Sequence, residues 1–288
     1  MQDRYAGDIG DLGKYGLLRV LCGHDLKWGV NWYLTPNDGL SGNGRVIDYL
    51  RDTPQNRKLF AACDLDLYEK LRGIVFPQAG DEKTLKQADE ERKACPHFEC
   101  PGKDEVTSCL NRRCVFKVER RAVLPEKTKF YSRILDFSHL SSMSKKENFR
   151  KRWVEDGFNI LGDCSVVFFD PDNGLEARSI SKTHKNGNKY VYADEIKPFY
   201  ECGQSLVIYQ HRTREAEEEY LKRIQSLIEE ATGRGELKMF IMRYHPRSVR
   251  DFIIVPHHRS SHGKIFEYRL KDMLESNWQQ HFSKRELP

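Results

Sequence analysis

Two aspartates and a proline follow an uninterrupted apolar segment near the middle of the chain. Residues 166–169 are Val-Val-Phe-Phe, and Asp170, Pro171 and Asp172 come directly after them. A short apolar run bounded by turn-forming residues is typical of a strand that is buried on both faces in a parallel sheet. We therefore expect Asp170 and Asp172 to project from the carboxyl end of this strand, where open α/β sheets bind their ligands. A strand-ending turn rich in Asp and Asn is the alternative, and it explains Asp172 better than Asp170.

Two further strand ends carry residues suited to acid–base or metal chemistry. Asp194 and Glu195 follow a short apolar segment, and His211 follows the predicted strand 205–209. If these strands are parallel neighbours, their ends and Asp170 share one crevice. One or two Mg²⁺ ions could be held against a phosphodiester by the carboxylates of Asp170, Asp172, Glu176, Asp194 and Glu195. His211 could then orient water or protonate a leaving group. A metal-dependent nuclease or phosphohydrolase is therefore one hypothesis for the function, and we treat it as the alternative to methyl transfer.

The first hypothesis is methyl transfer from S-adenosylmethionine (SAM) to an amino nitrogen of a nucleic-acid base. The amine needs hydrogen-bond acceptors, and the Asp170 carboxylate and the Pro171 carbonyl could supply them. A target base must also be taken out of its stack and held against an aromatic ring. A catalytically silent nucleic-acid-binding module on the same fold is a third possibility.

Two glycine-rich segments are candidates for a cofactor pocket. Residues 7–16 contain four glycines among two aspartates and a lysine, and an apolar helical stripe follows that Asp11 could cap. The second segment, after a predicted strand at 29–34, allows a backbone to approach a ligand closely. The candidate cofactor-binding residues are Gly7, Gly10, Asp11, Lys14, Tyr15, Asn37 and Asp38.

The elements that must position these residues alternate along the chain. Strands are predicted at 29–34, 129–135, 166–169, 189–193, 205–209, 239–242 and 251–255, and helices at 17–21, 45–75, 145–161 and 214–231. This alternation favours an α/β fold with a Rossmann-like, doubly wound, mostly parallel sheet and an antiparallel closing pair. We expect residues 1–288 to form a single α/β domain of the methyltransferase type, interrupted by a polar insert at 76–121.

Four cysteines cluster in this insert. They are Cys95, Cys100, Cys109 and Cys114. In a cytosolic chain such a cluster is more often metal-binding than disulfide-bonded, and the spacing suits a structural zinc knuckle. His97 could replace one thiolate. Two disulfides, or four plain thiols in the insert, are the alternatives.

Positive charge is concentrated in one stretch of the chain. The formal net charge is +5, and residues 112–152 contain 13 Lys and Arg against 4 Asp and Glu. Such a stretch suits the phosphates of a nucleic acid, and an ordinary solvated helix and loop surface is the equal alternative. The segment with His257, His258 and His262 is predicted to be an exposed loop rather than a metal site. Four arginines near it are candidate phosphate contacts: Arg243, Arg247, Arg250 and Arg259.

Composition also bears on location and partners. No apolar run approaches the ~18 residues of a membrane helix, and the first residues do not resemble a secretory leader. We therefore expect a soluble, cytoplasmic protein without a membrane partner. Nothing in the sequence indicates an oligomeric state.

The order of the motifs resembles that of the bacterial enzymes that methylate N6 of adenine in large-subunit ribosomal RNA, and more broadly the SAM-dependent methyltransferase superfamily. Residues 7–15 are similar to the family's opening segment, with Lys14 in the place of the family lysine. Residues 170–173 match in part its Asp-Pro-Pro-Tyr tetrad, with Asp172 for the second proline and Asn173 for the aromatic that stacks the target base. The N-terminal Gly-Asp-x-Gly-Asp-x-Gly-Lys-Tyr-Gly string is also similar to that of an uncharacterised bacterial group. The family resemblance implies SAM as cofactor and a nucleic acid as substrate.

Overall fold

The computed structural model of the chain describes residues 2–23, 25–36, 44–78, 81–95, 105–235 and 237–287. The chain divides into two compact units. Unit 1 comprises Met1–Gln2, Val20–Pro36 and Lys127–Pro288, and unit 2 comprises Asp3–Arg19 and Asn37–Glu126. Unit 1 is therefore built from segments that flank unit 2 in the sequence.

The described part of unit 1 contains a seven-stranded sheet in the order β2-β1-β3-β6-β8-β7-β9. The strands are β1 (Trp28–Asn31), β2 (Lys129–Tyr131), β3 (Val166–Phe169), β6 (Ser205–His211), β7 (Phe240–Tyr244), β8 (Arg250–Val255) and β9 (Phe282–Arg285). β2, β1, β3 and β6 are parallel, whereas β8 pairs antiparallel with β6, β7 with β8, and β9 with β7. The predictions of an α/β fold with a mostly parallel central sheet and of an antiparallel closing pair are confirmed.

β3 lies inside the parallel block, between β1 and β6. Its four side chains are completely buried. Val167 and Phe169 belong to the core on one face of the sheet, so Val166 and Phe168 point to the other face. A strand that is covered on both faces needs an apolar residue at every position, which explains the continuous apolar run in the sequence.

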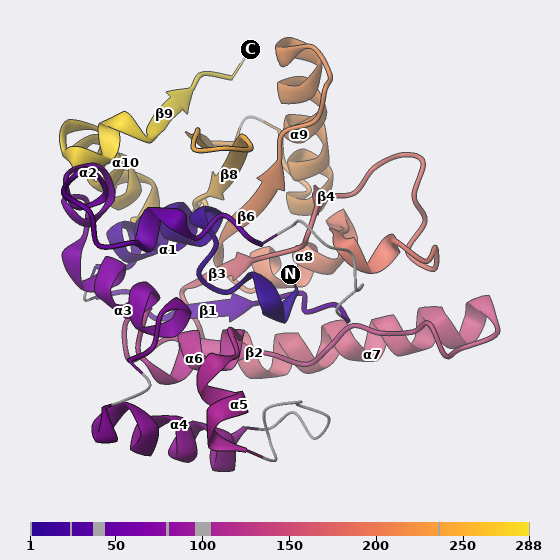
Figure 1. Cartoon of the computed structure of the whole chain (residues 1–288). Coiled ribbons are helices and arrows are strands. Elements are labelled where there is room, and N and C mark those ends of the chain that lie inside the picture. The colour runs from indigo at the N-terminus through magenta and orange to yellow at the C-terminus, as the bar shows by residue number, and fades with distance from the viewer. Residues whose placement is uncertain are drawn as a thin grey trace. The chain divides into compact units, whose positions relative to one another are not determined.

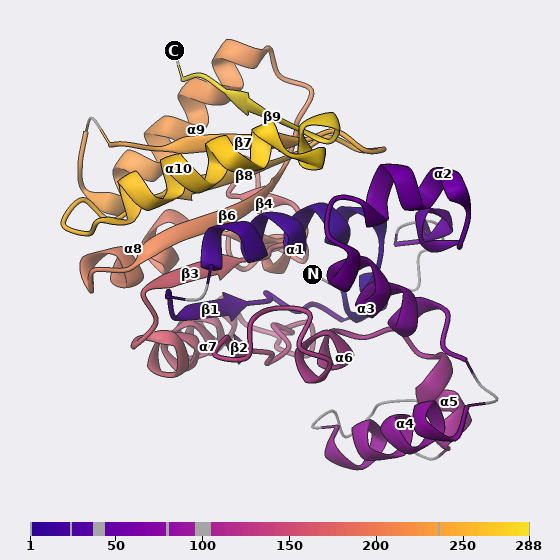
Figure 2. The same ribbon diagram turned by 90° about the vertical axis from the view of Figure 1, so that its left-hand side faces the viewer.

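Helices cover both faces of this sheet (Figures 1 and 2). α7 (Met143–Leu161), α8 (Ala193–Glu201) and α9 (Glu217–Thr232) pack on one face, and α10 (His262–Glu275) lies on the other. The first face shares one apolar core with the helices, to which Trp153, Phe199 and Ile224 contribute. A second, two-stranded parallel sheet joins β4 (Gly174–Leu175) to β5 (Tyr190–Val191).

The described part of unit 2 is helical. Its helices are α1 (Ile9–Cys22, whose last residues belong to unit 1), α2 (Pro54–Asn56), α3 (Leu65–Val75), α4 (Glu82–Ala94), α5 (Val106–Asn111) and α6 (Val115–Arg120). The predicted helical segment 45–75 consists of shorter pieces, because Thr53 and Asp64 each accept a backbone hydrogen bond that begins a new helix. Residues 76–121 form α4, α5 and α6. The interpretation of this segment as an insertion stays a prediction.

Two arginines of the antiparallel strands are paired inside unit 1. Arg243 of β7 donates two hydrogen bonds to Asp251 of β8, with Nε–Oδ1 and Nη2–Oδ2 distances of 2.7 and 2.8 Å. Arg250 donates to the Tyr209 hydroxyl at 2.7 Å. Both arginines were expected to contact phosphates, and that expectation is wrong for them because their side chains are buried among these partners.

Asp251→Ala is expected to destabilise the fold strongly. Asp251 is completely buried, so its loss leaves the Arg243 guanidinium without its closest carboxylate. Removal of one partner of a buried ion pair lowers the free energy of unfolding by about 3–5 kcal/mol, which urea unfolding followed by circular dichroism measures. Glu218→Ala, which removes an exposed pair with Lys222 on α9, is the control and should leave stability unchanged. Equal stability of the two variants would contradict the structural role of Asp251.

Candidate functional site

The direction in which the chain crosses the sheet reverses between β1 and β3. After β1, the chain forms β2 on one side of β1. After β3, the next strand of this sheet is β6, which lies on the opposite side (Figure 1). In open α/β sheets, the carboxyl ends of the strands at such a point flank a crevice in which ligands bind. The carboxyl ends of β1 and β3 are therefore the candidate site of unit 1.

Asp170, Pro171 and Asp172 lie at this point. Asp170 is 1% exposed, and its backbone N–H donates to the Asn31 carbonyl at the end of β1 at 2.9 Å. Pro171 is buried, and the Asp172 carboxylate accepts a hydrogen bond from the Thr35 hydroxyl at 3.3 Å. The three residues lie where the sequence predicted them, at the end of a buried strand. Their catalytic role stays a prediction.

Tyr33, between Asn31 and Thr35, has an unusual backbone conformation. Its φ angle is 45°, in the left-handed region that a tyrosine rarely adopts. Its N–H donates to the Asn31 side-chain oxygen at 3.2 Å, and its ring packs on Trp153 with centroids 4.8 Å apart. Strained residues persist where their surroundings determine them, and they cluster at functional sites. The sequence gives no sign of this conformation, because position 33 holds no glycine or asparagine that would indicate a left-handed turn.

The Tyr33 hydroxyl contacts a buried ion pair, which Arg150 and Glu195 form. The Tyr33 hydroxyl donates to Glu195 at 3.2 Å, and Arg150 of α7 donates from Nη2 to the same carboxylate at 3.0 Å. Arg150 also donates to the carbonyls of Gly187 and Tyr190 at 2.8 and 2.7 Å. Burial raises the pKa of Tyr33 well above its ordinary value, so its hydroxyl remains a donor. Arg150 was expected to bind phosphate as part of the basic stretch, and this is wrong because its guanidinium is enclosed.

The carboxylates expected to bind Mg²⁺ are engaged elsewhere. Asp194, in the first turn of α8, is exposed and forms an ion pair with Lys182. Glu176 accepts a hydrogen bond from the Ala193 N–H at 2.8 Å and so helps to cap α8. Burial raises the pKa of Glu176. Within the described ranges there is no group of three or more His, Cys, Asp or Glu side chains that could hold a metal ion.

His211 reaches the same edge of the sheet as the Asp170 segment. Its backbone N–H donates to the Asn173 carbonyl at 3.2 Å, and its Nε2 lies 3.2 Å from the Tyr209 hydroxyl. The parallel pairing of β3 with β6 produces this juxtaposition. The prediction that the two strand ends meet at one edge is confirmed, and the role of His211 in proton transfer stays a prediction.

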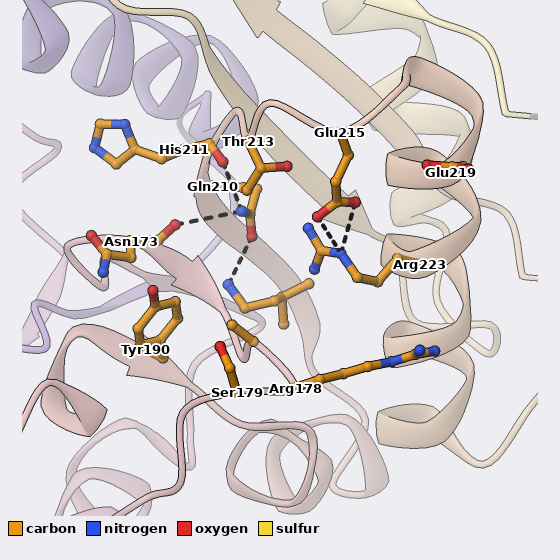
Figure 3. A pocket seen from close by; sticks show the side chains of 12 residues that line it. Asn173, Arg178, Ser179, Tyr190, Gln210, His211, Thr213, Glu215, Glu219 and Arg223 are labelled. Carbon is orange, nitrogen blue, oxygen red and sulfur yellow. Dashed lines mark hydrogen bonds and ion pairs between the residues drawn. The ribbon is translucent and has the colours of Figure 1, made fainter. Parts of the chain in front are cut away.

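A cavity of about 710 Å³ opens beside His211 (Figure 3). It is lined by Asn173, Leu175, Ala177, Arg178, Ser179, Tyr190, Gln210, His211, Thr213, Glu215, Glu219 and Arg223. Gln210 lies at its centre: its Oε1 accepts from the Leu175 N–H at 2.8 Å, and its Nε2 donates to the His211 carbonyl at 2.8 Å. Gly174 has a φ of 115°, and a Cβ there would lie 2.3 Å from Gln210 Oε1, so only glycine allows β4 to approach this closely.

Charge is distributed unevenly around this cavity. On the α9 side, Glu215 accepts from Arg223 Nε at 3.1 Å with both carboxylate oxygens, and Glu219 is exposed. On the other side, the exposed Arg178 side chain extends toward α9 (Figure 3). The volume lies within the range of ligand sites, about 300–1,000 Å³. The lining combines two rings (Tyr190 and His211), two amides (Asn173 and Gln210), two arginines and two glutamates, a set that suits a planar polar ligand.

In unit 2, the glycine-rich motif forms the beginning of α1. Asp8 accepts from the N–H groups of Gly10 and Val46 at 3.0 and 3.1 Å. Asp11 accepts from the Gly7 N–H at 2.9 Å, and the two aspartates together resemble a reciprocal capping box. Asp11 was expected to precede and cap this helix. The predicted position of Asp11 is wrong, because Asp8 precedes α1 and Asp11 lies in the first turn of the helix.

The remaining candidate cofactor residues of the motif are enclosed in unit 2. Lys14 donates to the Asp11 carboxylate at 2.9 Å, and Lys14 and Tyr15 are both buried. Asn37 and Asp38 lie outside the described residues. Since Lys14 belongs to unit 2 and Asp170 to unit 1, a pocket shared by the two stays a prediction.

Cations of the basic stretch 112–152 have partners within their own units. In unit 2, Arg121 pairs with Glu91 at 2.7 Å, and the buried Lys117 amine donates to the Leu110 carbonyl at 3.0 Å. In unit 1, Lys129 pairs with Asp163 at 2.8 Å. The prediction that these residues bind phosphate is wrong for those whose side chains are buried. The exposed ion pairs agree with the alternative, an ordinary protein surface.

Three of the four clustered cysteines are described and buried. Cys95 follows α4, Cys109 lies in α5, and Cys114 precedes α6. Burial raises the pKa of the Cys114 thiol. Cys100 and His97 lie outside the described residues. No three described donors in this segment form a metal group, and the zinc knuckle stays a prediction.

The histidine segment lies at the other end of the parallel strands, beside the first residue of β6. The Ser205 hydroxyl oxygen lies 2.7 Å from His262 Nδ1 and accepts from the His257 N–H at 2.8 Å. His257 is 6% exposed, so the expectation of an exposed loop is wrong for it. Burial lowers the pKa of His257 and of His262.

Comparisons with protein-family models, with curated proteins and with solved structures found no match to this chain. None of the described helices combines the length and the apolar character that crossing a bilayer requires. The site must therefore be interpreted from its own geometry.

Stability is expected to fall in mild acid because of His257 and His262. Their pKa values lie below the ordinary 6.5 in the folded protein, so below that pH the unfolded state binds more protons. The free energy of unfolding is thus retained above about pH 6.5 and lost as the pH falls toward the folded-state pKa. Urea unfolding at several pH values should show a smaller slope for the His257→Asn/His262→Asn double variant than for the exposed control His139→Asn. Identical slopes would contradict the assignment.

The zinc knuckle predicts one zinc per chain. Elemental analysis of purified protein should find the metal, and thiol titration should show Cys95, Cys100, Cys109 and Cys114 protected until a chelator is added. Cys202→Ser, which removes an exposed thiol outside the cluster, is the control and should keep the metal. Absence of zinc together with titration of all four thiols would remove the knuckle.

Proposed function

We propose that this protein is a methyltransferase-like enzyme that transfers a methyl group from SAM to an amino group of a nucleic-acid base. The observation that carries the proposal is the position of Asp170. A carboxylate that is 1% exposed, followed by a buried proline, ends a strand at the point where the sheet's connections reverse. The carboxyl ends of strands at such a point are where open α/β sheets bind their ligands.

Asp170 and Pro171 would bind and orient the target amine. An amine that donates one N–H to the Asp170 carboxylate and one to the Pro171 carbonyl presents its nitrogen lone pair away from both acceptors. The new nitrogen–carbon bond forms at that lone pair, and one N–H proton leaves toward the Asp170 side or to water. The bound SAM would supply the electrophilic methyl group, leaving its sulfur as a neutral thioether.

The segment after β1 would hold the cofactor beside this amine. Thr35 and Asp172, joined by a hydrogen bond at 3.3 Å, place a hydroxyl and a carboxylate at the carboxyl end of β1. Such groups would suit the ribose hydroxyls of SAM, as acidic residues bind ribose hydroxyls in Rossmann-like folds. Tyr33 and the Arg150–Glu195 pair would keep this segment in place. A contribution from Lys14 and the glycine-rich motif is part of the same hypothesis.

The nuclease alternative has no specific observation in its favour. It needs several carboxylates around a metal ion. Asp194 is paired with Lys182, and Glu176 caps α8, as described above. The silent-module alternative differs from the proposal only in whether SAM binds and reacts.

Asp170→Asn is expected to separate catalysis from binding. Calorimetric titration should detect SAM binding to the native protein at or below about 1 mM. The variant should bind SAM with similar affinity, because the altered group faces the amine rather than the cofactor. Methyl transfer to RNA from labelled SAM should fall at least about 100-fold, the scale of losing one positioned group in a transition state.

Asp194→Asn is the matched control, because it removes a carboxylate that is exposed and only paired with Lys182. This variant should keep SAM binding and methyl transfer at the native level. Absence of SAM binding at millimolar concentration, in a protein that unfolds cooperatively, would overturn the proposal. Transfer that survives Asp170→Asn would remove Asp170 from its assigned role.

A further inference from the structure

The segment between β4 and β5 carries only positive charge along one rim of the cavity. Residues 177–189 include four Lys and Arg and no Asp or Glu. Arg178 lines the cavity, and Lys185 is exposed further along the segment. Neither has an ion pair among the contacts of the described residues, in contrast to Lys182, which pairs with Asp194. These two cations are therefore available to a ligand.

This basic segment is held in place by the Arg150 guanidinium. Arg150 donates to the carbonyl oxygens of Lys182, Gly187 and Tyr190 at 3.3, 2.8 and 2.7 Å. The Tyr192 hydroxyl donates to the Ile180 carbonyl at 3.0 Å. Because both ends of the segment are fixed, the cations lose less entropy on binding an anion than they would on a mobile loop.

An aromatic ring stands at the end of this segment. Tyr190 lines the cavity and is opposite Gly174 in the register of β4 and β5. Its hydroxyl is directed toward Asn173, whose side chain also lines the cavity (Figure 3). Asn173 occupies the position where the family resemblance expects an aromatic. Tyr190 is therefore the side chain of this segment on which a planar group in the cavity could stack.

The remaining walls favour a base over an acidic protein segment as occupant. Asn173 offers both a donor and an acceptor, as the edge of a base requires. Glu215 and Glu219 on the α9 side would repel an acidic group of a ligand. An anionic chain is thus confined to the rim with Arg178, while its neutral, planar part can enter the cavity.

We propose that residues 178–189 and Tyr190 form a binding surface for single-stranded nucleic acid. One base enters the cavity and stacks on Tyr190, Asn173 contacts its edge, and the flanking phosphates lie on Arg178 and Lys185. Stacking on an aromatic side chain together with a basic track is the general way in which proteins bind single strands. The inference deepens the proposed function, on which it rests for the reaction, because it names the substrate as single-stranded rather than duplex.

Fluorescence anisotropy with a labelled single-stranded RNA of about 12 nucleotides tests the surface. Arg178→Glu/Lys185→Glu should weaken binding at least about tenfold and lower the slope of log affinity against log salt by about 2. The matched control is Lys151→Glu/Arg152→Glu, which reverses two exposed cations of α7 in the basic stretch 112–152. This control should bind like the native protein.

Tyr190→Ala should weaken binding about fivefold or more, whereas Tyr190→Phe, which keeps the ring, should stay close to native. A duplex of the same sequence should bind more weakly than the single strand. Thermal unfolding of each variant confirms that it is folded, and Tyr190→Phe separates the loss of the ring from any loss of the hydroxyl.

Three results would overturn the surface: equal binding of duplex and single strand, a loss carried by the α7 control instead, or polyglutamate binding as tightly as RNA. Failure of the surface is distinguishable from failure of the methyltransferase proposal. SAM binding without RNA binding removes this surface alone. RNA binding that depends on Arg178, Lys185 and Tyr190 in a protein that does not bind SAM removes the reaction and keeps the surface.

Discussion

One buried guanidinium, that of Arg150, connects the parts of unit 1 on which the candidate site depends. It pairs with Glu195 in the first turn of α8, and through this carboxylate it supports the Tyr33 hydroxyl at the end of β1. The same group donates to the carbonyls of Lys182, within the basic segment, and of Tyr190, where the segment joins β5. A buried guanidinium is stable only if each of its N–H groups has an acceptor. The crevice wall at Tyr33 and the cavity rim are therefore coupled through one residue.

The sequence analysis predicted the elements whose signals are local. The apolar run 166–169 and the segment 205–209 are central strands, and a charged helix follows at about 214–231, because burial on both faces or on one stripe leaves a direct pattern in the residues. The site aspartates could be placed for the same reason, as they follow such a strand. β9 and α10 were not predicted as elements, since β9 has a single apolar residue and the apolar residues of α10 are spaced among charges.

What could not be predicted depends on partners that are distant in the sequence. Arg150 was assigned to a phosphate-binding stretch by its neighbours along the chain, but its carboxylate partner is 45 positions away. Arg243 and Asp251 form their pair only because β7 and β8 lie side by side. Net charge along a segment counts residues and cannot show which of them are enclosed. Cavity residues such as Tyr190 likewise gain a role only through the register of β4 with β5.

The glycine-rich motif shows that one set of residues can serve a local structural need and also resemble a ligand site. Asp8 and Asp11 satisfy the free N–H groups at the start of α1, and Lys14 neutralises Asp11. These groups are the same ones that a phosphate or cofactor would use at a helix start. The contacts within the motif therefore explain its residues structurally, and its contribution to a cofactor pocket stays a prediction.

The short segment from Asp170 to Asn173 joins the two halves of the candidate site. Asp170 and Asp172 contact the end of β1, through the Asn31 carbonyl and the Thr35 hydroxyl, whereas Asn173 lines the cavity and binds the backbone of His211. Four extended residues span at most about 14 Å, so both halves must lie within that reach. A planar group held in the cavity and a reactive group held at β1 would then meet across the same stretch of backbone. Under the proposed function, the same four residues would therefore connect the carboxylate that orients the amine with the wall of the cavity that holds the base.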